Sequence, residues 1–333
     1  MEILLEYLRE TRGTIDSEVD STPVCLGNHT DMLLSASNRE YLHEFASELA
    51  SIGLARPLVV VTKGHISRFL AEALDNLNIK IIIFHSQSFH RTTLEIQTEK
   101  GPVLTPDQTF DAGATYRDIK NITPVHFWRP ITRKSVPTAQ WTLETVRQLK
   151  LSGYCCSVAI GLSVGPGISQ QELIETGLLE QTAEVSGEIW DDNVWADINS
   201  AAVAIGYPVY RSTSCAIGLA TGKAEALGVW DDRRGAAQYC RPCNCPTTQR
   251  NLCQSKSLHP EDLEEPLAWI ANQIGGDTSR FEVLPGRRIR VSGEIRQSLV
   301  SLVLHLYQIE LLPQSISADR AWLGRFGRKD SNE

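Results

Sequence analysis

The sequence predicts an α/β fold built on a parallel β-sheet. Short apolar runs, typical of strands buried on both faces, alternate with helical patterns along the first three-quarters of the chain. Parallel strands joined by helices require right-handed crossovers, and an open doubly wound sheet and a barrel both satisfy this pattern. The runs expected to be strands are residues 23–27, 57–61, 79–84, 122–127 and 157–162.

Local signals place the helices between these strands. Ser37-Asn-Arg-Glu40 has the form of a capping box, so a helix is expected to open there and to end near residue 52. Further helices are expected at about 66–77 and 138–150, and residues 168–200 look helical and acidic. Residues 1–12 also carry apolar side chains at helical spacing.

The chain is expected to have three parts. The order predicted within the last part is a helix, strands at 281–284 and 288–291, and a long helix over 294–309. The three parts are an α/β domain at 1–200, a cysteine-rich segment at 201–256, and a small C-terminal α+β domain with a tail at 257–333.

Composition narrows the classes of function. The net charge of −8 over 333 residues does not indicate a nucleic-acid partner, which would need a basic face. No run reaches the roughly 18 consecutive apolar residues of a membrane span, so no membrane partner is expected. The acidic, amphipathic start lacks the features of a signal peptide. A cytoplasmic location is therefore expected, and the eight cysteines are read as thiols, metal ligands or redox groups.

Polar side chains follow four successive strands. In parallel α/β folds, ligands bind beyond the carboxyl ends of the strands. Four polar endings at one edge therefore predict a pocket for a charged, amino-acid-like or nucleotide-like ligand, with ordinary solvated loops as the alternative. These endings contain Asn28, His29 and Asp31, then Thr62 and Lys63, then Ser86 and Ser88, and finally His126 and Arg129.

Four cysteines crowd into one short, proline-containing segment: Cys240, Cys243, Cys245 and Cys253. Four thiolates satisfy either a tetrahedral zinc ion or a cubane iron–sulfur cluster. The Cys-x-Cys step and the single distant cysteine do not match a zinc ribbon, so a [4Fe–4S] cluster is the first expectation and zinc the alternative. Idle thiols at this density would oxidise readily.

The order of the strand ends resembles the radical S-adenosylmethionine superfamily, in particular the branch that contains spore photoproduct lyase. The resembling pieces lie between residues 24 and 167. They are Leu26-Gly-Asn-His-Thr-Asp31, Val60-Val-Thr-Lys-Gly64, Ser86-Gln-Ser88 followed by Glu95, and His126-Phe-Trp-Arg-Pro-Ile131.

The resemblance implies a partial (β/α)6 barrel that binds S-adenosylmethionine at its top. It implies that Asn28 to Asp31 meet the methionine amino group, while Lys63, Ser86 and Ser88 contact the ribose or the methionine carboxylate. Arg129 would grip that carboxylate, because a guanidinium can bind it in bidentate fashion. Glu95 belongs to the same cofactor-binding set, and Cys240 to Cys253 would resemble an auxiliary cluster.

One departure from the family pattern is large. The defining Cys-x-x-x-Cys-x-x-Cys loop, which follows the first barrel strand, is absent from the sequence. The missing strand would leave 23–27 as an apolar edge. Three explanations fit: a fragment or mis-started reading frame, a second polypeptide that supplies the strand and loop, or a degenerate relative without the chemistry.

Two hypotheses follow. The first is reductive cleavage of S-adenosylmethionine to a 5′-deoxyadenosyl radical that acts on an unknown substrate, with help from a missing N-terminal segment or a partner. The second is a non-catalytic zinc or iron–sulfur protein whose degenerate barrel binds a ligand or partner.

Overall fold

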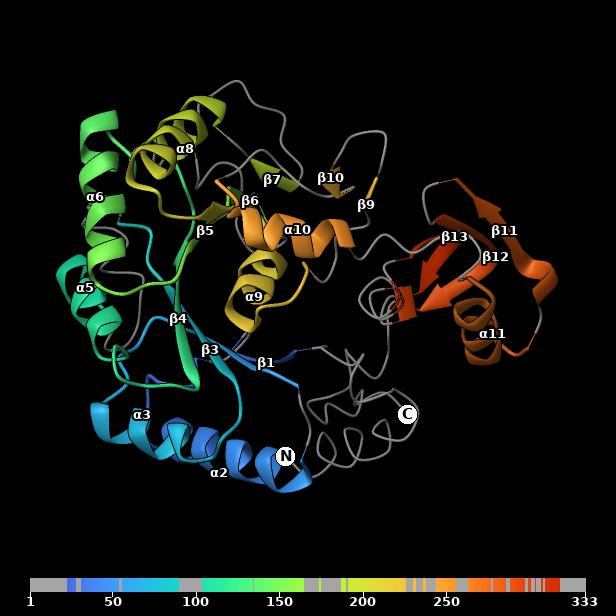
Figure 1. Ribbon diagram of the computed structural model, residues 1–333, viewed down its shortest axis with the longest axis horizontal. Coiled ribbons are helices and arrows are strands. Elements are labelled where there is room, and N and C mark those ends of the chain that lie inside the picture. Colours follow the sequence, from blue (N-terminus) through green and yellow to red (C-terminus); the bar gives the residue numbers. More distant parts are fainter. Residues whose placement is uncertain are drawn as a thin grey trace. The chain divides into compact units, whose positions relative to one another are not determined.

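The computed structural model of the chain is shown in Figure 1. The chain divides into two compact units, the first comprising residues 1–222 and 241–247 and the second 223–240 and 248–333; each is described by itself. The described residues are 23–27, 31–53, 56–89, 104–133, 135–164, 174, 187–189, 191–225, 230–231, 236–237, 244–255, 263–276, 278–285, 288–296, 299–300, 303, 307 and 309–317.

Six parallel strands form the central sheet of the first unit, in the order β1-β2-β3-β4-β5-β8. Strand order follows chain order without a reversal. This order differs from that of a doubly wound sheet, which reverses at a switch point. The α/β class is confirmed, and the sheet is compatible with a partial barrel. The strands are Val24–Leu26, Leu58–Thr62, Ile81–Ser86, Ile122–Trp128, Ser157–Ala159 and Val209–Tyr210.

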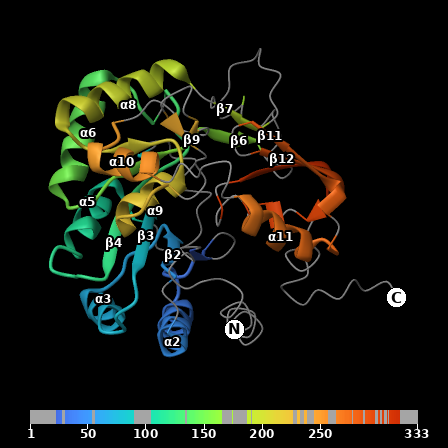
Figure 2. The ribbon, with the colours of Figure 1, turned by 45° about the vertical axis from the view of Figure 1, so that its right-hand side comes forward.

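Helices cover the two faces of this sheet unequally (Figures 1 and 2). Five helices lie along one face, and α9 (Thr213–Thr221) lies on the other. Because side chains alternate along a strand, Leu58 and Val60 pack under the five helices while Val59 packs on the face that carries α9. The five helices are α2 (Ala36–Ile52), α3 (Arg68–Asp75), α5 (Pro106–Ala114), α6 (Ala139–Leu151) and α8 (Asp192–Ile205).

Helix starts follow their capping side chains. The predicted capping box at Ser37 is wrong by two residues, since the N-cap of α2 is Ser35, whose hydroxyl accepts the Asn38 N–H at 3.1 Å. The start of α6 is confirmed, with Thr138 accepting the N–H of Trp141. Helix α5 follows a capping box at Thr105 that the sequence analysis did not use.

The expected strand at 157–162 is two short strands. After β5 the chain continues into β6 (Leu162–Val164), which pairs antiparallel with β7 (Gly187–Ile189) outside the central sheet. Helix α8 begins just after β7, at a later point than the helical region expected over 168–200, most of which lies outside the described residues.

The second unit contains a three-stranded sheet of order β11-β12-β13. Strands β11 (Phe281–Leu284) and β12 (Arg288–Arg296) are antiparallel, and β12 is parallel to β13 (Glu310–Ser317). The α+β expectation for the C-terminal part agrees with this, but the helix predicted from residue 294 is wrong at its start. After a register shift between Val291 and Glu294, β12 resumes with buried Ile295.

The rest of the second unit is small. It includes the two-residue strands β9 (Trp230–Asp231) and β10 (Ala236–Ala237), the helices α10 (Thr247–Ser255) and α11 (Glu264–Gln273), and a 3-10 turn at Thr278–Arg280. Helix α11 packs against the three-stranded sheet through Ile270. Over the part of the chain that is described, no helix is long and apolar enough to cross a membrane.

Candidate functional site

The candidate site lies at the carboxyl ends of the central strands. Asp31 follows β1, Lys63 follows β2, Ser86 ends β3 and Arg129 follows β4. Ser88 lies in the loop after β3, where it is half-buried. Asn28 and Glu95 fall outside the described residues.

Ser86 and Arg129 come together as the sequence analysis expected. The Nε of Arg129 lies 3.4 Å from the Oγ of Ser86, and the guanidinium carbon sits 4.5 Å from the centroid of the Phe127 ring. Ser86 is buried, with 6% of its surface exposed, whereas Arg129 is exposed. Among the described residues, the terminal nitrogens of Arg129 have no hydrogen-bond partner. Arg129 is thus an exposed cation whose guanidinium is contacted on one side by Ser86 and Phe127.

The hydrogen-bond ladder becomes irregular just after β4, at Arg129. The N–H of Ile160 donates to the carbonyl of Trp128, and the N–H of Ile131 donates back to the carbonyl of Ile160. In a regular parallel ladder the return bond would come from residue 130, but Pro130 has no N–H, so Ile131 takes its place. The chain thus holds one extra residue opposite Ile160. Such a bulge re-aims the side chain that it carries, here Arg129.

Asp31 is engaged within its own loop. Its Oδ1 accepts hydrogen bonds from the N–H of Leu33 at 2.9 Å and from the hydroxyl of Thr62 at 2.6 Å, and its Oδ2 accepts the N–H of Lys63 at 2.5 Å. The carboxylate therefore joins the ends of β1 and β2. This structural role accounts for an acidic residue at this position without any ligand.

Gln87, the first residue after β3, forms two side-chain hydrogen bonds. Its Nε2 donates to the carbonyl of Leu104 at 2.7 Å, and its Oε1 accepts the N–H of Phe89 at 3.0 Å. The N–H of Leu104 in turn donates to the carbonyl of Lys63. These bonds keep the ends of β2 and β3 in register beside Ser86.

Sequence analysis missed Arg211, which follows β8 at the same edge of the sheet. Its guanidinium carbon lies 5.4 Å from the centroid of the Trp195 ring. The signal was weak because β8 has only two residues, Val209 and Tyr210, too few for a strand pattern.

His126, expected at the ligand edge, is buried on the helix-covered face. Its Nδ1 lies 3.1 Å from the hydroxyl of Ser157, which lies 3.0 Å from the hydroxyl of Tyr207. On the neighbouring strand, the Nε2 of His85 lies 2.8 Å from the hydroxyl of Tyr116. Packing explains the correction: Arg129 lies over Phe127, which belongs to the cluster under α9, whereas His126 alternates with Phe127 along β4 and faces the other side.

Burial sets the protonation of the two histidines. Desolvation lowers the pKa of His85 to about 3 and that of His126 to about 3, with the charge of His65 adding to the effect on His85. Both rings are therefore neutral at neutral pH. We expect them to act as packed, hydrogen-bonded parts of the interior.

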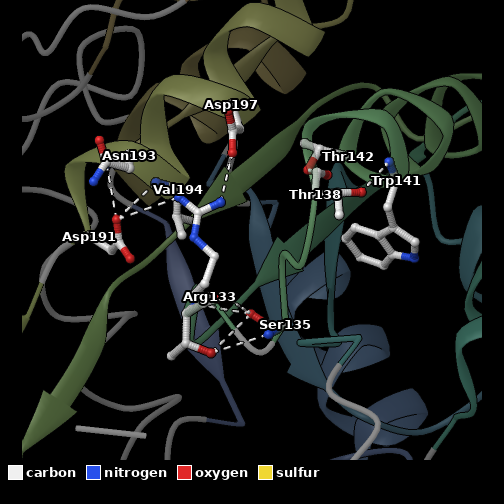
Figure 3. A network of polar contacts seen from close by, with 10 residues as sticks. Arg133, Ser135, Thr138, Trp141, Thr142, Asp191, Asn193, Val194 and Asp197 are labelled. Atoms are coloured by element: carbon white, nitrogen blue, oxygen red, sulfur yellow. Dashed lines mark hydrogen bonds and ion pairs between the residues drawn. The ribbon is translucent and has the colours of Figure 1, made fainter. Parts of the chain in front are cut away.

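The loop that follows Arg129 is held at several points (Figure 3). Arg133 reaches toward α8, where its Nη1 lies 2.8 Å from Oδ2 of Asp197 and its Nη2 lies 4.0 Å from Oδ1 of Asp191. Asp191 also caps α8 by accepting the N–H groups of Asn193 and Val194, each at 3.0 Å. Because both ends of the contact are fixed, the loop position depends on α8.

Two members of the cysteine quartet are described. Cys245 is half-buried against the face of the sheet that carries α9, and its sulfur lies 3.7 Å from the carbonyl oxygen of Pro246. Cys240 and Cys243 fall outside the described residues. Across the described residues, no three ligand-type side chains converge as they would around a metal ion.

Two N–H groups contact the sulfur of Cys253. Its sulfur accepts the backbone N–H of Glu225 at 3.3 Å and faces the Nε2 of Gln249 at 4.0 Å. Gln249 is buried, and the same nitrogen donates to the carbonyl of Lys223 at 2.7 Å. N–H donors aimed at a sulfur favour its anionic form, which is the form that binds metals. Cys253 therefore fits a metal ligand, whereas the Cys245 thiol is directed at a carbonyl oxygen.

The edge around Arg129 is suited to binding an anion. An exposed guanidinium beside a buried hydroxyl can bind a carboxylate through charge-assisted hydrogen bonds. The sequence matches no protein-family model and no curated protein.

Proposed function

We propose that this chain binds S-adenosylmethionine at the carboxyl edge of its central sheet, as the ligand-binding part of a radical S-adenosylmethionine-type protein. The observation that carries the proposal is the exposed guanidinium of Arg129 beside buried Ser86 at the carboxyl edge of the sheet. In this role Arg129 holds the methionine carboxylate. The unreversed order of the parallel strands supports the proposal, because a barrel winding brings all the strand ends to one rim.

The activity implied by the resemblance is reductive cleavage of S-adenosylmethionine to a 5′-deoxyadenosyl radical. That step needs a Cys-x-x-x-Cys-x-x-Cys loop, which this sequence does not contain. We therefore assign ligand binding to this chain and the cluster to a further segment or partner polypeptide. The residues present bind and orient the carboxylate end of the ligand, and Phe127 fixes the plane of the guanidinium.

Calorimetric titration with S-adenosylmethionine tests the proposal. Arg129→Ala should weaken binding by about 1.5–3 kcal/mol, roughly tenfold to a hundredfold, because a hydrogen-bonded ion pair to the ligand is lost. Arg147→Ala is the matched control, since Arg147 is an exposed arginine that pairs with Glu144 on α6. Wild-type protein without measurable binding, or equal binding by Arg129→Ala, would contradict the proposal.

A second candidate function is metal binding without catalysis, with an iron–sulfur cluster or zinc held by the cysteine-rich segment. The observation in its favour is the pair of N–H donors that face the sulfur of Cys253. Binding of S-adenosylmethionine distinguishes the two candidate functions, because a protein that only binds metal retains its metal and does not bind this ligand.

A further inference from the structure

The hydroxyl of Ser135 is the centre of the loop that follows Arg129. It accepts the N–H of Thr132 at 2.9 Å, and it lies 3.2 Å from the carbonyl oxygen of Pro130 and 3.1 Å from that of Thr132. Ser135 is fully buried, and its own N–H faces the hydroxyl of Thr132 at 3.3 Å. These bonds hold Pro130, Thr132 and Ser135 together, and we call this cluster the Ser135 turn.

The turn acts on the peptide unit next to Arg129. The Ser135 hydroxyl faces two carbonyl oxygens, and one of them belongs to Pro130, the residue directly after Arg129 in the sequence. On the other side, Trp128 is fixed by its ladder bond to Ile160. The backbone of Arg129 is therefore held from both directions, at the bulge that re-aims its side chain.

The Arg133–Asp197 ion pair adds a weaker, outer hold on the same turn (Figure 3). Its side chains are 45% and 29% exposed, and exposed pairs contribute only about 0–1 kcal/mol. A buried hydroxyl that leaves polar groups unpaired when it is removed has the larger effect, about 1–3 kcal/mol. The hydrogen bonds of the buried Ser135 hydroxyl should therefore affect the direction of the Arg129 guanidinium more than the Arg133–Asp197 ion pair does.

We propose that Ser135 is a positioning residue that aims Arg129 at a ligand carboxylate. The inference rests on the proposed function, in which Arg129 holds that carboxylate. Ser135 itself does not touch the ligand; it acts through the carbonyl of Pro130 on the direction of the Arg129 side chain. The site then discriminates between ligands by their carboxylate, and this discrimination depends on Ser135.

The test compares two ligands that differ in that group. S-adenosylmethionine carries the carboxylate, and its decarboxylated form keeps the sulfonium, amine and adenosine but lacks it. The measured quantity is the ratio of their dissociation constants, obtained by calorimetry. Wild type should favour S-adenosylmethionine at least tenfold, and Ser135→Ala should reduce this preference at least threefold by weakening S-adenosylmethionine alone.

Thr142→Val is the matched control. Thr142 is also fully buried, and its hydroxyl donates to the carbonyl of Thr138, the N-cap of α6, at 2.8 Å (Figure 3). This variant loses a buried hydroxyl and some stability, and it should keep the wild-type preference. Ser135→Cys, of nearly equal size with a weaker donor, replaces Ser135→Ala if the alanine variant does not fold.

The possible outcomes distinguish a failure of the inference about Ser135 from a failure of the proposed function. If wild type prefers the carboxylate ligand and the Ser135 variants keep the full preference, the inference is wrong while the proposed function stands. If Thr142→Val loses the preference as much as Ser135→Ala, a general loss of stability explains both and the inference is again wrong. If wild type binds both ligands equally, or neither, the proposed role of Arg129 fails and the inference with it.

Discussion

His85 and His126 are register partners on the adjacent strands β3 and β4, and both imidazoles are buried on the helix-covered face of the sheet. Each ring is paired with a neutral partner, the hydroxyl of Tyr116 for His85 and that of Ser157 for His126. The carbonyl of Gln87 lies 3.2 Å from the Nε2 of His126. This row of polar groups makes the interior under α5 and α6 sensitive to acid.

We expect the free energy of unfolding to fall as the pH drops from about 6.5 to about 3. The pKa of each histidine is about 3 in the folded chain, against about 6.5 when unfolded, so the unfolded chain binds more protons throughout this window. Each histidine should contribute a slope of about 1.4 kcal/mol per pH unit. Urea unfolding at a series of pH values measures the slope. His126→Gln should lower it, and equal slopes in the wild type and this variant would contradict the assignment.

Gly27 should be intolerant of any side chain. Its φ is 95°, and a Cβ there would lie 2.2 Å from the carbonyl oxygen of Val61. Gly27→Ala combines a left-handed backbone with a clash against the neighbouring strand, so we expect a loss above about 4 kcal/mol, or failure to fold.

Gly222 provides the comparison for Gly27. It ends α9 with a φ of 66°, yet a Cβ there would meet nothing within 4 Å. Gly222→Ala should cost only the strain of the left-handed backbone, about 1–2 kcal/mol. Denaturant unfolding of both variants separates the clash from the backbone strain. Similar losses of unfolding free energy would show that Gly27 does not approach the Val61 carbonyl this closely.

Much of the fold was predictable because its central strands are buried on both faces. The runs at 57–61 and 79–84 are almost wholly apolar, the run at 122–127 is apolar at Ile122, Val125 and Phe127, and each overlaps a strand of the parallel sheet. Their order in the sheet was not predictable, because local sequence carries no information on which strands are neighbours. Strand β8 and helix α9 were missed for a different reason. The two residues of β8 are too few to show a strand pattern, and the nine residues of α9 are mostly small and show no clear apolar face.

The candidate site was predictable in part. Ser86 and Arg129 were both chosen as strand-end residues, and they are in contact. His126 was chosen by the same argument and proved to face the other side, since position relative to a strand end does not give the direction of a side chain. The burial and contacts of Ser135 could not be predicted, because no sequence pattern distinguishes a buried serine in a turn from an exposed one.

Asp31 should matter chiefly for stability. Asp31→Ala leaves the N–H of Lys63 and the hydroxyl of Thr62 without their acceptor, which should cost about 1–3 kcal/mol. Asp31→Asn keeps one oxygen and should cost less. Thermal unfolding measures the losses, and calorimetry measures S-adenosylmethionine binding under conditions where both variants are folded. A large loss of affinity in a fully folded Asp31→Asn would show that the carboxylate binds the ligand instead.

Cys253 and Gln249 give a prediction for the metal centre. They stand four residues apart on α10, so they share one face of the helix, which meets the segment from Lys223 to Glu225. If Cys253 binds a metal as a thiolate, Gln249 and the Glu225 N–H support it in the way that hydrogen-bonding partners support other ligands. Removing such partners typically weakens metal binding tenfold to a hundredfold. Cys253→Ser should lose most of the affinity for Co²⁺, and Gln249→Glu should lose roughly tenfold or more.

Cobalt is the probe because thiolate-to-cobalt charge transfer reports on the sulfur itself. Gln249→Glu keeps the size of the side chain but replaces the donor with a negative charge, so it should shift the charge-transfer band as well as weaken binding. Thr248→Glu places the same charge on an exposed position of α10 and should change neither. A merely structural role for Gln249 would lower the unfolding temperature of the metal-free chain and leave the band in place. Unchanged cobalt binding in Cys253→Ser would remove Cys253 from the metal site, because a ligand cannot be lost without a loss of affinity.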